Sequence, residues 1–237
     1  MSKQNRNVLI TGGTGFLGSA VTKAFLAQGD TVAVTYLFDN EVERFKQYNP
    51  DLSEKVTFIY ANVTEESDVQ KTVQDYISQF GHLDILVNIV GGFVGGIPAA
   101  ELDEDRWDFM MNLNLKSVFL CCKTVLPHMT ERGYGKIVNI SARAGLKGEA
   151  GLSVYCVSKG GVRTLTEALA AEVMDSGINV NCIMPSIMDT PMNREAMPDE
   201  DHSRWVKTED VAKVICFLTS DDSTIINGAA IPVYGRA

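Results

Sequence analysis

The sequence is short of the residue patterns that mark disulfide-rich, metal-binding and membrane proteins. Its five cysteines are an odd number with no Cys-x-x-Cys spacing, so we expect reduced thiols in the cytoplasm and no disulfide framework. The three histidines (His82, His128 and His202) lie far apart in the chain, and we expect no metal site. No apolar run approaches the roughly 20 residues that span a bilayer. The polar start MSKQNRN lacks a signal-peptide pattern, so we expect a cytoplasmic protein without a membrane partner.

Positive charge is also scarce. The 21 Lys and Arg residues face 30 Asp and Glu residues, which leaves a formal net charge of −9. Nucleic acids and anionic membranes both require a basic face, so neither is an expected partner. The chain is 45% hydrophobic and 22% charged, which is close to the globular average and sufficient for a sizeable core. A length of 237 residues suits one domain or two small ones.

Short β-branched runs alternate with longer amphipathic stretches along the chain. The predicted strands are residues 8–10, 31–37, 56–60, 83–87, 136–140, 178–184 and 230–234. The predicted helices are residues 16–28, 40–48, 65–80, 103–132 (in two pieces), 153–174 and 208–219, and residues 186–206 are expected to be irregular. This alternation predicts an α/β fold, a single doubly wound domain over residues 1–237 with a mainly parallel, seven-stranded sheet. Its ligand crevice should lie beyond the carboxyl ends of the strands.

A glycine-rich turn follows the first predicted strand. Residues 13–18 read Gly-x-Gly-x-x-Gly between a strand and a helix, the pattern that cradles the pyrophosphate of a dinucleotide. A glycine-rich turn without a ligand is the alternative. Tyr36 occupies the end of the second predicted strand, where an acidic residue would bind the ribose of NAD. Asp39 lies three residues beyond this position, too far along the chain for that role. Arg44 and Lys46 could bind the 2′-phosphate of NADP but fit a solvated helix face, so the choice between NAD and NADP stays open.

Tyr155 and Lys159 are four residues apart on a predicted helix and therefore share one face. A cation beside a phenol favours the phenolate and lowers its pKa. Such a tyrosine can exchange a proton near neutral pH, where an unperturbed tyrosine is a poor base. A surface pair without function is the alternative interpretation of this spacing.

Taken together, these motifs resemble the short-chain dehydrogenase/reductase family over essentially the whole chain. The landmarks in order are Thr11-Gly12-x-x-Gly15-x-x-Gly18, Asn62-Val63, Val87-Asn88-Ile89-Val90-Gly91, Asn114, Ile137-Val138-Asn139-Ile140-Ser141, Tyr155-x-x-x-Lys159 and Pro185-Ser186-x-x-x-Thr190. The resemblance implies a Rossmann-type fold, an NAD or NADP cofactor, and a small carbonyl or alcohol substrate. Because the family usually pairs through the helices that contain Asn114 and Tyr155, it also implies a homodimer or homotetramer.

The resemblance assigns a role to each matching residue. Tyr155 would be the general acid/base, Lys159 would bind the nicotinamide ribose and lower the pKa of Tyr155, and Asn114 would hold a water in the proton relay. Asn62 and Val63 would contact the adenine, and Thr190 would bind the nicotinamide carboxamide. The expected cofactor-binding residues are Gly12, Thr14, Gly15, Phe16, Leu17, Gly18, Tyr36, Asn62, Val63, Asn88, Gly91, Lys159, Pro185, Ser186 and Thr190.

The sequence departs from the family pattern at the usual catalytic serine. Counting 13 residues back from Tyr155 gives Ala142, while the neighbouring Ser141 should point to the opposite face. Ser153 or Arg143 could substitute for the missing hydroxyl. In having alanine at this position, the sequence resembles the dihydropteridine reductases. The segment DTPMNREAMP at residues 189–198, with Trp205 after it, is similar to the corresponding segment of those enzymes.

Three functions therefore remain open. The first is reduction of an ordinary carbonyl, the second is reduction of a quinonoid substrate, and the third is a nucleotide-binding sensor or scaffold with little catalysis. Family geometry places the substrate beside a loop at about residues 186–206, which could close as a lid. The expected substrate residues are Phe93, Ala142, Met188, Met192 and Trp205, with ordinary core packing as the alternative.

Overall fold

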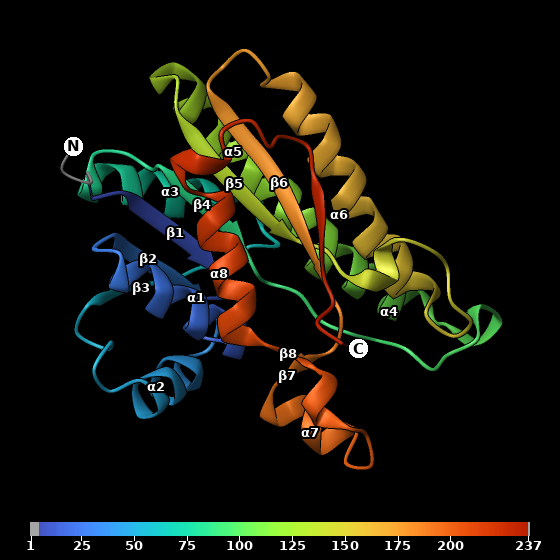
Figure 1. Cartoon of the computed structure of the whole chain (residues 1–237). Coiled ribbons are helices and arrows are strands. Elements are labelled where there is room, and N and C mark those ends of the chain that lie inside the picture. Colours follow the sequence, from blue (N-terminus) through green and yellow to red (C-terminus); the bar gives the residue numbers. More distant parts are fainter. Residues whose placement is uncertain (1–4, 237) are drawn as a thin grey trace.

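The computed structural model describes residues 5–236, and its centre is one parallel sheet (Figure 1). The strands run in the order β3-β2-β1-β4-β5-β6-β9, and every neighbouring pair is parallel. Their bounds are β1 Asn7–Thr11, β2 Thr31–Tyr36, β3 Val56–Tyr60, β4 Ile85–Asn88, β5 Gly135–Ile140, β6 Ile178–Pro185 and β9 Ala230–Val233. The strand order reverses between β1 and β4, and at such a point the carboxyl ends open a crevice for a ligand. The predicted single-domain, doubly wound fold is confirmed.

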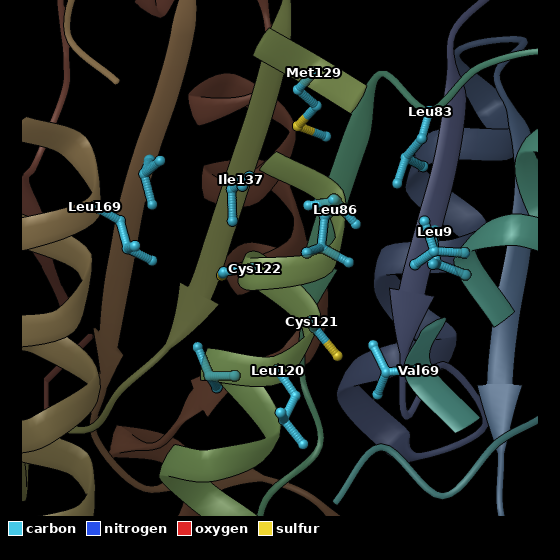
Figure 2. Close-up of a cluster of buried hydrophobic side chains, with 14 of the residues drawn as sticks. Leu9, Val69, Leu83, Leu86, Leu120, Cys121, Cys122, Met129, Ile137 and Leu169 are labelled. Atoms are coloured by element: carbon cyan, nitrogen blue, oxygen red, sulfur yellow. The ribbon is translucent and has the colours of Figure 1, made fainter. Parts of the chain in front are cut away.

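Helices cover both faces of this sheet. One layer contains α1 Phe16–Ala27, α2 Asp39–Tyr48 and α8 Thr208–Leu218, and the other contains α3 Glu66–Phe80, α5 Ser117–Arg132 and α6 Ser153–Glu172. Because side chains alternate along a strand, Leu9 faces the second layer while Val8 and Ile10 face the first. Figure 2 shows Leu9, Leu86 and Ile137 of the sheet with Cys121 and Cys122 of α5 in the second layer's core. Both faces of the sheet are therefore buried, which accounts for its continuous apolar strands.

The segment predicted as two helices is one continuous helix, Glu104–Arg132. It begins as α4 Glu104–Met111, passes through a π-helical turn at Asn112–Lys116, and continues as α5. The sequence offered no break that would mark this wider turn. By length and mean hydropathy alone the helix could cross a membrane. In the fold it packs on β4 and β5 and buries Met110, Leu120 and Val125, so it is a core helix.

The segment expected to be irregular contains short regular elements. Strand β7 Met188–Asp189 pairs with β8 Val206–Lys207, and between them lies α7 Pro191–Ala196. Thr190 caps α7 by accepting a hydrogen bond from the Asn193 N–H at 3.2 Å, and Pro191 suits the first helical position. The prediction was wrong here because two-residue strands and a six-residue helix leave no periodic pattern.

Candidate active site

The glycine turn joins β1 to α1 with little space between their backbones. A Cβ on Gly18 would lie 2.3 Å from the Gly12 oxygen, and a Cβ on Gly13 would lie 2.4 Å from the Val34 side chain. Gly12 itself has a φ of +65°, which other residues rarely adopt. These three glycines are therefore required by the fold itself.

Gly15 differs from the other glycines of the turn. A Cβ there would meet only the Gly12 oxygen, at an ordinary 3.5 Å, and φ is −74°. Gly15 is also the N-cap of α1, which has no side-chain cap and no acidic residue in its first turn. The first-turn N–H groups thus face an open position that suits an anion, and this geometry fits the pyrophosphate of a dinucleotide.

Hydrogen bonds hold the neighbouring strand ends in place. Thr11 Oγ1 accepts from the Ile89 N–H at 3.1 Å, and the Gly12 N–H donates to Thr35 Oγ1 at 3.2 Å. At the end of β4, the Asn88 amide donates to Asn139 Oδ1 at 2.9 Å. Asn88 is buried, and its own Oδ1 has no partner among the described residues. The crevice between β1 and β4 therefore has a rigid floor.

Helix α6 presents Tyr155 and Lys159 at the same edge of the sheet. The Lys159 ammonium is buried and donates to the Ile140 carbonyl, the last residue of β5, at 2.9 Å. A Cβ on Gly91 would come within 3.0 Å of Lys159 Nζ and 2.8 Å of Asn114 Oδ1. Glycine at position 91 therefore allows the segment after β4 to lie against this lysine.

Asn114 lies in the π-helical turn and is fully buried. Its Oδ1 accepts from the Gly92 N–H at 2.8 Å, while its Nδ2 donates to the Gly92 carbonyl at 3.1 Å and to Ser158 Oγ at 3.1 Å. Both amide hydrogens are thus in use. The side chain clamps the segment after β4 onto α6, and the water-holding role implied by the family resemblance stays a prediction.

Burial dominates the electrostatics of the Tyr155–Lys159 pair. It raises the pKa of Tyr155 to about 12, with the Cys156 thiol as a smaller cause. It lowers the pKa of Lys159 to about 8. The causes of this shift are burial and the Cys156 thiol, so the expected lowering of the Tyr155 pKa by Lys159 stays a prediction. Tyr155 is accordingly a protonated acid at neutral pH.

The hydroxyl closest to the usual catalytic-serine position faces away from the crevice. Ser141 is buried, and its Oγ donates to the Lys159 carbonyl at 2.8 Å, as its place on an extended segment predicts. Ala142 follows it and offers no donor. Ser153, one of the two possible substitutes, begins α6 two residues before Tyr155. Arg143, the other, places its guanidinium 5.4 Å from the centroid of the Tyr234 ring.

Comparison with known proteins identifies this arrangement. The family model for short chain dehydrogenase matches residues 6–201. The chain belongs to the short-chain dehydrogenase/reductase family. It is 32% identical to the 3-oxoacyl-[acyl-carrier-protein] reductase FabG of Thermotoga maritima over 99% of this chain and 98% of that protein. It is 35% identical to the (2S)-[(R)-hydroxy(phenyl)methyl]succinyl-CoA dehydrogenase subunit BbsD of Thauera aromatica, covering 99% and 97%.

Solved structures agree with this assignment. The structure of ElxO with NADP bound is 30% identical, with a TM-score of 0.93 and coverage of 98% of both chains. The protein is therefore an NAD(P)-dependent oxidoreductase of the short-chain dehydrogenase/reductase family.

The expected substrate residues divide into two groups. Phe93 is 65% exposed and meets the Tyr155 ring edge-on with centroids 4.9 Å apart, and Met192 is 67% exposed. Met188, in contrast, packs on the core beneath α1 and α8. Trp205 is only 7% exposed and lies against His202, with ring centroids 4.3 Å apart. Trp205 thus anchors the 186–206 segment, while Phe93 and Met192 offer apolar surface.

The remaining expected cofactor residues lie at the ends of strands. Tyr36 meets Tyr60 edge-on, and Asn62 Oδ1 accepts from the Thr64 N–H and hydroxyl at 3.1 and 2.7 Å. Val63 is buried, and Pro185 ends β6. The Ser186 hydroxyl donates to the Tyr234 carbonyl, and Thr190 caps α7. All of them end or follow β2, β3 or β6 at the carboxyl edge of the sheet.

A groove of about 970 Å³ opens beside the glycine turn. Thr14, Gly15 and Phe16 line it, as do Lys23 of α1 and Arg44 of α2. No hydrogen bond or ion pair engages the Lys23 or Arg44 side chains within residues 5–236. Arg44 is exposed, as the predicted solvated helix face requires, and its side chain also lines this groove. Lys46 instead lies 5.7 Å from the centroid of the Phe58 ring.

The first turn of α2 contains one carboxylate that sequence reasoning missed. Glu41 Oε2 accepts from the Leu37 and Phe38 N–H groups at 3.0 and 3.3 Å. It caps the start of α2 and is committed to the backbone. The spacing of Glu41 from the N-cap Phe38 is the signal that could have revealed it.

Proposed function

We propose that this protein transfers hydride between a nicotinamide cofactor and a small carbonyl or alcohol substrate, with Tyr155 as the general acid/base. The observation that carries the proposal is the buried pair Lys159 and Asn114 around Gly91 and Gly92, with the half-buried Tyr155 one helical turn before Lys159. The family supports the same chemistry. We further propose that residues 186–206 close over the substrate, since Thr190 and Met192 belong to that segment.

Each residue of the cluster has a defined task in this mechanism. The bound cofactor supplies or accepts the hydride. The open position at Gly15 and the first-turn N–H groups of α1 would hold its pyrophosphate. Tyr155 donates its phenolic proton to the substrate oxygen as negative charge develops there. Lys159 stabilises the resulting phenolate and is itself positioned by the Ile140 carbonyl. Asn114 keeps the segment after β4 in place.

The pH dependence should follow Lys159. Because burial lowers its pKa to about 8, the ammonium predominates below about pH 8 and the neutral amine above it. We expect kcat/KM for the reduced cofactor, which reports the free enzyme, to be flat near neutral pH and to fall about tenfold per pH unit above pH 8. Lys159→Arg should extend the plateau because arginine stays charged. A profile that is unchanged in this variant would contradict the role of Lys159.

A quinonoid substrate is the second candidate, and Ala142 is the observation that favours it. With Ser141 bonded to the Lys159 carbonyl, neither residue donates to a substrate oxygen. In hydrolases, one such donor is worth roughly 10²–10³ in rate. A quinonoid dihydropterin is an activated hydride acceptor, so its reduction depends less on polarisation of the acceptor. The dihydropteridine reductase resemblance supports the same substrate.

One steady-state assay separates these candidates. NADH and NADPH oxidation would be followed with a panel of simple aldehydes and ketones, and with quinonoid dihydropterin generated in solution. We expect turnover of carbonyls, and Ala142→Ser should raise the carbonyl rate about tenfold or more by restoring the donor. Fast turnover of the pterin alone, unaffected by Ala142→Ser, would instead establish the second candidate. No turnover of any compound would favour a nucleotide-binding sensor or scaffold.

We propose that NADP(H) is preferred over NAD(H). Residues 36–38 contain no carboxylate, Glu41 is committed to the backbone, and Arg44 and Lys23 line the groove beside Gly15. The additional phosphate of NADP(H) suits these cations. The same assay traces measure this preference directly.

We propose a homodimer or homotetramer that forms through the outer faces of α4–α5 and α6. Helices α4 and α6 pack side by side, and together with α5 they expose the large apolar side chains Phe109, Phe119 and Val157. Light scattering should give two or four times 25.9 kDa. Phe119→Asp should shift the mass toward the monomer because it places a charge in the buried interface. A monomer in the unmodified protein would contradict this arrangement.

A further inference from the structure

The ring of Phe93 lies beside the reacting phenol, and the mechanism above gives it no task. Phe93 belongs to the loop that follows β4. Its ring meets the Tyr155 ring edge-on, with an interplanar angle of 76° and centroids 4.9 Å apart. Phe93 is nevertheless 65% exposed. A ligand that covered this apolar surface would gain the free energy of removing it from water.

Two anchors fix the loop on either side of Phe93. On one side, the Asn114 side chain bonds to both the N–H and the carbonyl of Gly92, at 2.8 and 3.1 Å. On the other side, the Ile97 N–H donates to the Gly151 carbonyl at 3.1 Å, just before α6 begins. The loop therefore runs along the start of the helix that carries the reacting phenol, and the fold holds residue 93 beside it.

The ring itself fits into space that Gly95 leaves open. A Cβ on Gly95 would lie 2.6 Å from Phe93 Cζ and 2.4 Å from Leu152 Cδ2. Real Cβ atoms do not approach other heavy atoms so closely, so a larger residue at position 95 would displace one of these side chains. Leu152 is the N-cap of α6. The Phe93 ring is thus packed on the side of Gly95 and Tyr155, while most of the residue stays exposed.

The contact with Tyr155 places this exposed ring next to the reacting group. In the proposed mechanism the substrate's carbonyl oxygen accepts the phenolic proton, so it lies at hydrogen-bond distance from the Tyr155 hydroxyl. Because the two ring centroids are only 4.9 Å apart, a group bonded to that carbonyl is within reach of the Phe93 ring. Aromatic rings pack on one another edge-on or offset-stacked at such distances, with a gain beyond burial alone. An aryl group is therefore the substituent that suits this position best.

We propose that Phe93 selects the substrate by packing against an aromatic ring bonded directly to the reacting carbonyl. The substrate class is then an aryl aldehyde or aryl ketone, or a benzylic alcohol in the reverse direction. This inference rests on the proposed function, because it names the substrate class of the same site. It gives Phe93 a part in specificity and none in proton transfer, which stays with Tyr155.

The test compares benzaldehyde with cyclohexanecarbaldehyde, two uncharged aldehydes with equal numbers of carbon atoms, of which only the first is aromatic. In the unmodified protein kcat/KM should be higher for benzaldehyde. Phe93→Leu keeps an apolar side chain but loses the ring, so it should lower the benzaldehyde-to-cyclohexanecarbaldehyde ratio of kcat/KM about threefold to tenfold. Phe93→Tyr keeps the ring and should retain the ratio. Phe217→Leu, which removes an exposed ring from α8, is the matched control and should leave the ratio unchanged.

Calorimetric titration of the protein saturated with reduced nicotinamide cofactor tests the same contact without turnover. Benzamide and cyclohexanecarboxamide serve as unreactive counterparts of the two aldehydes. A preference for benzamide that is lost in Phe93→Leu and retained in Phe217→Leu would support the inference even if the protein reduced neither aldehyde, a result that would count only against the proposed function. Turnover of both aldehydes with equal kcat/KM in the unmodified protein would overturn the inference and leave the proposed function intact. A ratio that is unchanged in Phe93→Leu would overturn it as well.

Discussion

Tyr155→Phe should lower kcat for carbonyl reduction about 10²–10⁴-fold, the range expected for loss of a positioned general acid. Burial raises the pKa of this phenol to about 12, so the hydroxyl holds its proton at neutral pH and is ready to donate it. Phenylalanine keeps the ring and its edge-on contact with Phe93 but removes the proton. The Kd for cofactor should change little, because Lys159 and the glycine turn stay in place.

Tyr134→Phe is the matched control for this variant. Tyr134 precedes β5 at the opposite edge of the sheet, where Lys136 lies 5.8 Å from the centroid of its ring. Removing that hydroxyl should leave kcat unchanged. A Tyr155→Phe variant that retains more than about a tenth of kcat would show that another group supplies the proton. Equal losses in both variants would point to a general effect on folding.

The fold was predictable because its signals are periodic and local. Apolar strands such as residues 8–10 and helices such as residues 65–80 repeat their patterns over several turns, and the structure places them within one or two residues of the prediction. The glycine turn was predictable for the same reason. Its requirement for glycine comes from two backbones that are adjacent in both sequence and space.

The parts of the site that sequence reasoning missed depend on contacts between distant segments. Ser141 bonds to Lys159, Asn114 clamps Gly92, and Arg143 reaches Tyr234 across three strand ends. None of these pairs has a spacing that reveals it. The raised pKa of Tyr155 has a similar origin, because burial is a property of the whole fold whereas the Tyr-x-x-x-Lys spacing reports only one neighbour. Local patterns therefore identify the chemical groups, and the packed fold decides which of them are committed to other contacts.

Gly18→Ala and Gly15→Ala should have opposite consequences, although they lie three residues apart in one motif. A Cβ on Gly18 would overlap the Gly12 oxygen at 2.3 Å and the Gly13 Cα at 2.5 Å, and both are backbone atoms that no side-chain rotation can move. We expect the free energy of unfolding to fall by about 1–3 kcal/mol. For a chain of this size the melting temperature should drop by about 2–4 °C for each kcal/mol.

Gly15→Ala should leave the fold intact, because a Cβ there makes one ordinary contact and φ is already −74°. The unfolding free energy should stay the same or rise by up to about 1 kcal/mol, since alanine restricts the unfolded chain. Cofactor binding should weaken by about tenfold or more, because the methyl group occupies the place where the backbone approaches the pyrophosphate. Thermal melting and cofactor titration of both variants measure the two effects separately.

If Gly15→Ala bound cofactor normally, the pyrophosphate would lie elsewhere, and the basic groove beside Arg44 and Lys23 would be the next position to test. If Gly18→Ala melted like the unmodified protein, α1 would have to shift away from β1, and cofactor affinity would then fall in that variant too.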